Sequence, residues 1–243
     1  MTRHHHSAHP PRSLLGLWAH PDDESYLSAG LMQRTLQAGG RVTVVALTDG
    51  EAGFGDDDPR TLAERRALRR AELGTAMAAI GVTDIRFLGH PDGSLSEVPA
   101  AGVVDRLVEI AREVRPDVVV TFGPDGITGH DDHVTAGRLA ADAWRAWGHG
   151  ELWQAAKTDA WLDEWRVLHD ELGIWMTEEP TGVPEDEIAA VLDLTPAELN
   201  RKRAALGGHA SQSDVVAAAM GEPVYRRWIA QEAFRRAALV GAS

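Results

Sequence analysis

The sequence predicts an α/β fold: a Rossmann-like, mostly parallel sheet with helices on both faces and an active site at the carboxyl ends of the strands. Short apolar runs alternate with amphipathic segments through residue 147, and each run ends in a polar loop. Four successive strand–helix units favour right-handed crossovers and therefore a parallel sheet. The 243 residues suffice for one full core, so we expect a disordered or tag-like leader over 1–12 and a single domain over 13–243.

The expected elements follow from apolar spacing and from the residues that end each pattern. Strands are predicted at 14–19, 41–48, 84–88, 117–122, 151–156 and 188–194. Helices are predicted at 24–38, 60–80, 98–115, 131–147, 158–172, 196–207 and 222–239. Gly39, Gly81 and Pro116 stop the first three helices, because neither glycine nor proline continues a helix well.

Composition excludes several classes of function. Cysteine is absent, which rules out disulfides, thiolate zinc sites, iron–sulfur clusters and a cysteine nucleophile. Acidic residues outnumber basic ones 37 to 24, and the net charge of −13 disfavours a nucleic-acid partner. No apolar run approaches the ~18 residues of a membrane span, and Leu14–Ala19 is too short for a signal peptide. We therefore expect a cytoplasmic protein; a homo-oligomer is compatible with the sequence.

Polar clusters follow each of the first four predicted strands, at the edge where open parallel sheets bind ligands. Within them, His20 and Asp23 are three residues apart, and so are His130 and His133. Residues at this spacing face the same way on a helical turn, so the two pairs can supply three ligands and leave one position open. Such an open set is typical of catalytic zinc, although nitrogen and oxygen ligands also admit Fe²⁺, Mn²⁺ or Co²⁺.

The segments around the two pairs resemble those of a known family. Ala19–Glu24, which reads AHPDDE, resembles the signature of the LmbE-like (PIG-L) zinc-dependent de-N-acetylase family, and Gly129–His133 resembles its His-x-Asp-His motif. Supporting matches are TDGEAG at 48–53, Arg69 with Glu72 and Leu73, LGHPDG at 88–93, and a C-terminal pattern of Lys202, Ala205, His209, Ser211 and Gln212. Asp131 stands where the family more often has proline, and residues 143–185 match nothing in the family.

The resemblance implies a function for each polar residue of the two main motifs. The implied metal ligands are His20, Asp23 and His133. Asp22 would be the general base that takes the proton of the attacking water. His130 would act as a charged acid that stabilises the oxyanion and protonates the leaving amine. Asp132 would either hold His130 charged, with the pKa of His130 above its ordinary value of about 6.5, or be a helix-start charge favoured by the dipole.

Other residues are expected to support or border this site. Arg69 and Asp92 resemble family positions that contact sugar hydroxyls; for Arg69, a salt bridge within an arginine-rich helix is the alternative. Glu24 is expected to support the first motif, and His209 to be structural. His90, His149 and His169 are expected to be ordinary surface or loop histidines.

Tryptophan is concentrated in the unmatched segment. Six of the eight tryptophans fall between Trp144 and Trp175. They can pack the core or form an aromatic wall for a sugar ring. We expect packing for most of them, with one or two at the rim of the site, and we expect residues 143–185 to shape the substrate pocket.

These observations predict a zinc-dependent hydrolase that removes an N-acetyl group from a small GlcNAc-type substrate, as in low-molecular-weight thiol or glycoconjugate metabolism. One alternative is an amidase of thiol–sugar conjugates, which depends on the room that residues 143–185 leave for a larger acyl group. Another is a non-catalytic, metal-dependent sugar-binding protein, which would not need Asp22 and His130 as base and acid. A dinucleotide binder is disfavoured because HPDDE, rather than G-x-G-x-x-G, follows the first strand.

Overall fold

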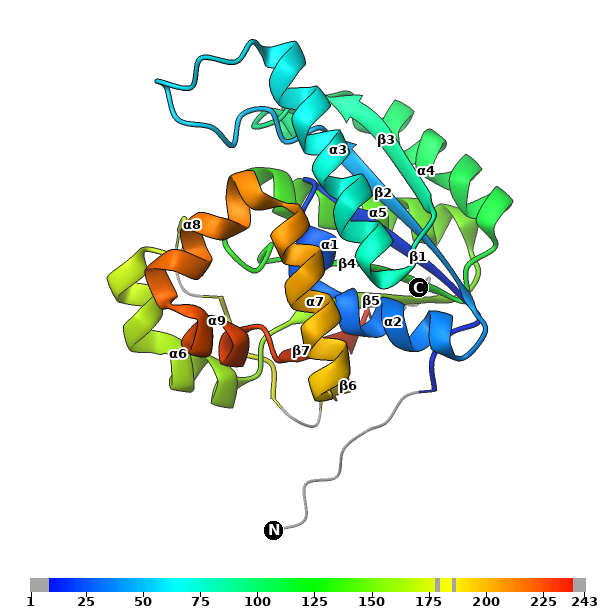
Figure 1. The fold of residues 1–243 in the computed structure, drawn as a ribbon. Helices are drawn as coiled ribbons and strands as arrows, with labels where there is room; N and C mark the ends of the chain where they lie inside the picture. Colours follow the sequence, from blue (N-terminus) through cyan, green and yellow to red (C-terminus); the bar gives the residue numbers. More distant parts are fainter. Residues whose placement is uncertain (1–8, 178–179, 185–186, 238–243) are drawn as a thin grey trace.

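The computed structural model describes residues 9–177, 180–184 and 187–237, and these form one seven-stranded sheet (Figure 1). The strands are β1 (Ser13–Trp18), β2 (Arg41–Thr48), β3 (Asp84–His90), β4 (Val118–Phe122), β5 (Glu151–Ala156), β6 (Ile188–Asp193) and β7 (Gln231–Arg236). Their order is β3-β2-β1-β4-β5-β7-β6. The first five strands are parallel, and β7 runs antiparallel to both β5 and β6. The predicted mostly parallel α/β fold is confirmed.

Helices cover both faces of the sheet, as predicted. They are α1 (Asp23–Leu27), α2 (Ala29–Gln37), α3 (Leu62–Ile80), α4 (Ala100–Val114), α5 (Asp131–Trp147), α6 (Asp159–Leu172), α7 (Pro196–Gly208), α8 (Ala210–Met220) and α9 (Glu222–Trp228), with a 3₁₀ turn at Leu95–Glu97. Figure 1 shows α2, α3 and α7 on one face of the sheet and α4 and α5 on the other. The central strands β1 and β4 are buried along their whole length.

The sequence explains where the long helices begin and end. Helix α3 starts with a capping box, in which the side chain of Thr61 accepts from the backbone N–H of Glu64 and the side chain of Glu64 accepts in return. It ends at Gly81, whose φ of 88° suits glycine. Helix α5 begins after His130, whose ring accepts from the backbone N–H of Asp132. The cap of α5 therefore starts this helix directly after the polar loop that follows β4.

The strand order creates a switch point between β1 and β4. The chain moves outward from β1 to β2 and β3, then returns to the other side of β1 with β4 and β5. Helices on the two sides of this point lie on opposite faces, so the loops that follow β1 and β4 diverge and leave a crevice. The first loop carries His20 and the second carries His130. The fold therefore brings the two predicted motifs together.

Two predicted elements differ from the structure. The helix expected at 24–38 is broken at Ser28, which has an extended φ of −144°. The helix expected at 222–239 is wrong beyond Trp228, because Gln231–Arg236 forms β7. Its residues QEAFRR favour a helix locally, but they fill the gap between β5 and β6, where Phe234 becomes fully buried. Helix α8 was not predicted at all.

The leader is described only in part. Residues 1–8 lie outside the described residues, whereas Arg12 donates its backbone N–H to the carboxylate of Asp117 at 3.0 Å. Across the described ranges, no helix combines the length and the apolar character that crossing a membrane requires.

Candidate active site

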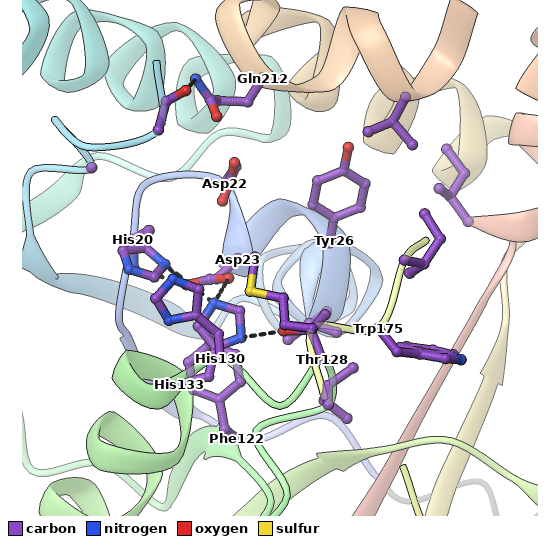
Figure 2. Close-up of a pocket in the computed structure, with 18 of the residues that line it drawn as sticks. His20, Asp22, Asp23, Tyr26, Phe122, Thr128, His130, His133, Trp175 and Gln212 are labelled. Carbon is purple, nitrogen blue, oxygen red and sulfur yellow. Dashed lines mark hydrogen bonds and ion pairs between the residues drawn. The ribbon is translucent and has the colours of Figure 1, made fainter. Parts of the chain in front are cut away.

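A cavity of about 470 Å³ lies at the carboxyl edge of the sheet, beside the switch point. Seven of the eight predicted site residues line it: His20, Asp22, Asp23, Arg69, Asp92, His130 and His133. The eighth, Asp132, is fully buried and contacts the ring of His20. Figure 2 shows the histidines on one side of the cavity and Trp175 on the opposite side. The cavity thus has a polar end, built from the predicted motifs, and an aromatic end.

The loop after β1 holds two adjacent carboxylates in different environments. Asp22 has a φ of 126°, which residues other than glycine rarely adopt. Its backbone N–H donates to the carboxylate of Glu24 at 3.0 Å, which supports this strained conformation. As a result Asp23 lies against His133, while Asp22 lies against Arg69. Glu24 therefore supports the motif, as predicted.

The loop after β4 positions His133. Gly126 has a φ of 65°, and a Cβ atom there would meet the Cβ atom of His133 at 2.9 Å, so this close approach needs glycine. The ring of His133 stacks on Phe122, the last residue of β4, with 4.2 Å between ring centroids. Its Nδ1 lies 3.0 Å from the carbonyl oxygen of Gly126 and 3.1 Å from the hydroxyl of Thr128. Nδ1 is therefore the donor, and Nε2 is free to bind a metal.

Three side chains, from the loop after β1 and from the first turns of α1 and α5, converge on one point. His20 Nδ1 lies 3.1 Å from His133 Nε2 and 3.7 Å from a carboxylate oxygen of Asp23. His133 Nε2 lies 3.2 Å from the other oxygen of Asp23. These are the residues that the family resemblance implies as ligands. Their two nitrogens and one carboxylate are the donor types that catalytic zinc uses.

The second nitrogen of His20 is held by two carboxylates. His20 Nε2 lies 3.0 Å from Asp92 Oδ1 and 3.3 Å from Asp132 Oδ2. The remaining oxygens of both carboxylates accept backbone N–H groups: Asp92 accepts from Ala52, and Asp132 from Leu95. Asp92 and Asp132 thus fix the orientation of the His20 ring with Nδ1 toward the convergence point.

The charge around His20 favours a cation. Burial alone would lower the pKa of His20, but the hydrogen bonds to Asp132 and Asp92 and the charge of Asp23 outweigh burial and raise this pKa to about 10. Burial raises the pKa of Asp23 well above its usual range. Carboxylates that stabilise a proton on His20 also stabilise a divalent cation at the same place. The donor types, their orientation and the local charge therefore fit a metal ion.

Two groups of three side chains bring one possible ligand atom of each residue within 4.8 Å of the others: His20 with His130 and His133, and His20 with Asp92 and Asp132. In the second group, the carboxylates are engaged by backbone N–H groups and by the far side of His20. His20 and His133 both belong to the first group, and Asp23 as the third ligand stays a prediction.

The carboxylate of Asp132 does not pair with the side chain of His130, so the geometry gives no direct support to the prediction that it holds His130 charged. Its carboxylate faces His20 and the backbone of Gly93 and Leu95, while His130 Nδ1 accepts from the backbone N–H of Asp132 at 3.0 Å. Burial, followed by the charge of His20, lowers the pKa of His130, although the charge of Asp132 acts in the opposite direction. His130 and Asp132 are close in sequence, but their side chains have different surroundings. The carboxylate of Asp132 contacts His20, whereas His130 lines the cavity.

Arg69 and Asp92 line the cavity, but both are engaged with the protein. The guanidinium of Arg69 is 2% exposed and pairs with Asp22 and Glu72, each at 3.1 Å, and with the carbonyl oxygen of Pro21. The salt-bridge alternative is therefore present in the structure. Contact of Arg69 or Asp92 with sugar hydroxyls stays a prediction.

The C-terminal pattern of the family resemblance holds the motif loops in place. His209 Nε2 lies 2.9 Å from the carboxylate of Glu24, and both side chains are buried. The backbone N–H of Ser211 donates to Glu72 at 2.8 Å, and the amide of Gln212 donates to the carbonyl oxygen of Gly53 at 2.8 Å. His209 is thus structural, as expected.

The aromatic end comes largely from the segment that matches no family motif. Trp161 and Trp175 line the cavity together with Trp228, whereas Trp144, Trp153 and Trp165 are buried and do not line it. This agrees with the expectation that one or two tryptophans of the segment border the site. The expectation for His169 is wrong: it is 1% exposed, and Trp228 Nε1 donates to it at 2.9 Å. Burial, followed by the charge of Lys157, lowers its pKa to about 4.

Lys157 is a cavity residue that the sequence reasoning missed. It follows β5 directly, so it occupies the same edge as the residues that follow β1 and β4. Its position directly after a predicted strand could have indicated that Lys157 lies near the site. A lone lysine there, however, suggests neither a metal ligand nor a catalytic pair.

Comparisons with known proteins agree with this geometry. The family model described as "PIG-L: GlcNAc-PI de-N-acetylase" matches residues 15–144. A 1D-myo-inositol 2-acetamido-2-deoxy-alpha-D-glucopyranoside deacetylase from Kineococcus radiotolerans is 34% identical, over 83% of this chain and 69% of the relative. A protein of the same name from Thermomonospora curvata is 36% identical, over 86% of this chain and 83% of the relative.

A solved structure supports the fold independently. The N,N'-diacetylchitobiose deacetylase from Pyrococcus horikoshii is 22% identical and superimposes with a TM-score of 0.66, over 93% of this chain and 84% of that one. The resemblance stated from the motifs is confirmed. The chain belongs to the PIG-L de-N-acetylase family and is an N-deacetylase, an amide hydrolase.

Proposed function

We propose that this enzyme is a zinc-dependent deacetylase that removes the N-acetyl group of a small GlcNAc-bearing substrate. The observation that carries the proposal is the convergence of His20 Nδ1, His133 Nε2 and the Asp23 carboxylate in the wall of a cavity. The Kineococcus and Thermomonospora relatives are named for deacetylating a glucosamine–inositol compound, and a cavity of about 470 Å³ has room for a sugar with an attached group. That substrate class links the proposal to thiol or glycoconjugate metabolism.

The proposed metal ligands are His20, Asp23 and His133, and zinc suits their nitrogen and oxygen donors. When bound, a divalent cation polarises the amide carbonyl and acidifies a water molecule. Asp92 and Asp132 act as positioning residues, because they hold the His20 ring by its other nitrogen.

Asp22 is the proposed general base. Its carboxylate lines the cavity beside the ligands without belonging to them, and Arg69 holds it at 3.1 Å. The partly exposed Asp22 side chain can take a proton from water. The strained backbone of Asp22 is consistent with a residue kept for chemistry.

His130 is the proposed hydrogen-bond donor to the reacting amide. Its Nδ1 accepts a backbone N–H, so a neutral ring carries its proton on Nε2. From the cavity wall this N–H can donate a hydrogen bond to the developing oxyanion. The proton that Asp22 takes from the attacking water can then pass to the leaving amine.

The organisation of the chain is part of the proposal. We infer one domain over residues 13–243, supported by a sheet that pairs β5, from the middle of the chain, with β7, from its C-terminal part. The cytoplasmic location and the oligomeric state stay predictions from the sequence.

The test is release of a primary amine from GlcNAc-inositol by the purified enzyme, with metal content measured by elemental analysis. We expect one zinc per chain. Asp22→Asn should keep the zinc and lose at least ~10²-fold in turnover, the usual scale for a general base. Asp131→Asn is the matched control, because Asp131 is an exposed carboxylate at the start of α5.

Three outcomes would contradict parts of the proposal. Tight binding of acetylated sugars without amine release would favour the sugar-binding alternative. Faster cleavage of a larger acyl group than of acetyl would favour the amidase alternative. Full zinc occupancy in His133→Ala would refute the ligand assignment.

A further inference from the structure

The aromatic end of the cavity is a continuous surface of rings. Trp161 lies 6.1 Å from Trp228, and Trp228 lies 5.9 Å from Tyr26, measured between ring centroids. His169, at 4.4 Å from Trp175, joins that ring to the same cluster. All of these except His169 line the cavity. Aromatic faces of this kind favour flat apolar groups and offer few hydrogen bonds to hydroxyls.

Lys157 is the cation of this end. The chain has only two lysines against 22 arginines. Lys202 is fully buried and paired with Glu232 at 2.8 Å. The ammonium of Lys157 lies 4.1 Å from the ring centroid of Trp161, and within the described ranges it has no hydrogen bond or ion pair. A cation that faces a cavity without a counterion is available to an anion of the ligand.

The electrostatics of Lys157 agree with its geometry. Burial, followed by the charge of Lys202, lowers its pKa to about 7, although Glu232 acts in the opposite direction. Burial disfavours the charged form of a lysine, and a close carboxylate would favour it. An anionic group on a ligand would supply the missing partner.

We propose that the aromatic end is the aglycone subsite, and that it takes a flat apolar group bearing one negative charge, such as an aryl carboxylate, which pairs with Lys157. This inference rests on the proposed function, which puts the acetamido group at the histidines, and Trp175 lies across the cavity from them (Figure 2). Lys157 is then a specificity-determining residue.

The experiment compares three substrates: the phenyl and the 4-carboxyphenyl glycosides of GlcNAc, and GlcNAc-inositol. We expect kcat/KM for the 4-carboxyphenyl glycoside to exceed that for the phenyl glycoside by about ten- to a hundredfold, mostly through KM. Lys157→Met should remove this difference, because it should lower kcat/KM for the 4-carboxyphenyl glycoside much more than for the phenyl glycoside. Lys157→Arg should restore part of it.

Arg227→Met is the matched control. The guanidinium of Arg227 lies 5.2 Å from the ring centroid of Trp165, but neither residue lines the cavity. Removing this cation from a neighbouring tryptophan should leave the preference unchanged.

Binding separates failure of this inference from failure of the proposed function. Calorimetry with both aryl glycosides needs no turnover. No amine release from any substrate, with tighter binding of the 4-carboxyphenyl glycoside that Lys157→Met abolishes, would refute the proposed function alone. Equal binding and equal kcat/KM for the two aryl glycosides would refute the subsite, and so would equal losses on both in Lys157→Met.

Discussion

The two ends of the cavity are built in different ways. At the polar end, His20 lies in the loop after β1, and His133 lies in the first turn of α5, the helix that follows β4. The strands β1 and β4 are parallel neighbours. At the aromatic end, Trp161 comes from α6, and Trp228 comes from α9, far along the chain. The polar end depends on local geometry at strand ends, and the aromatic end depends on how distant helices pack. The polar end can therefore keep one chemistry while sequence changes at the aromatic end alter which substrate binds.

Residues 196–232 connect the two ends. Lys202 donates to Glu232 at 2.8 Å and to the carbonyl oxygen of Tyr26 at 2.7 Å. Glu232 also accepts the backbone N–H groups of Gly30 and Leu31 at the start of α2. This buried network ties α7 and β7 to the helices that follow the first motif. Damage to it should therefore affect both ends together.

Lys202→Met should produce the largest effect on stability. It leaves the Glu232 carboxylate buried without its cation, and breaking a buried pair in this way costs about 3–5 kcal/mol. Urea unfolding should show a lower midpoint at an unchanged slope. The double variant Lys202→Met/Glu232→Gln should recover part of the loss, because no uncompensated charge remains. A single-variant loss within about 0.5 kcal/mol would show that the network is not what joins the two ends.

The same contrast explains what the sequence could predict. Strand-end position and three-residue spacing anticipated the residues of the polar end, because both depend on a few consecutive residues. They could not anticipate the partner of Asp132, since its carboxylate meets the ring of His20, more than 100 residues away in sequence. At the aromatic end, QEAFRR favours a helix locally, and nothing near His169 in the sequence indicates that it is buried. Pairing with β5 and contact with Trp228 decide both, and both are non-local.

Asp132→Asn tests the polar end alone, with an intermediate effect. The carboxylate of Asp132 contacts the ring of His20, so removal of this carboxylate should weaken metal affinity about 10- to 100-fold. Activity should return at excess zinc, since Asp22 and His130 are untouched. The measurement is zinc competition with a chelating dye, with Asp131→Asn as control. Unchanged zinc affinity with a permanent loss of turnover would instead place Asp132 in the chemistry.

A pH profile tests the aromatic end alone, with the smallest effect. Lys157 has a pKa lowered to about 7, chiefly by burial, so it is cationic below that pH and neutral above it. The ratio of kcat/KM for the 4-carboxyphenyl glycoside to that for the phenyl glycoside should therefore be high near pH 6 and fall severalfold by about pH 8.5. The substrate carboxylate stays ionised over this range. Among the neighbouring groups, His169 has a pKa of about 4 and remains neutral, and the Lys202–Glu232 pair stays buried and joined.

Taking this ratio cancels the titration of the polar end, because both substrates use the same metal ligands and the same base. Lys157→Arg sharpens the test further. A guanidinium keeps its charge throughout the range, so the ratio in this variant should be independent of pH. Two results would show that Lys157 does not bind the charge of the aglycone. One is a wild-type ratio that does not change with pH, and the other is a ratio in Lys157→Arg that falls in parallel with the wild type. The substrate preference would then have to come from the shape of the tryptophan surface alone.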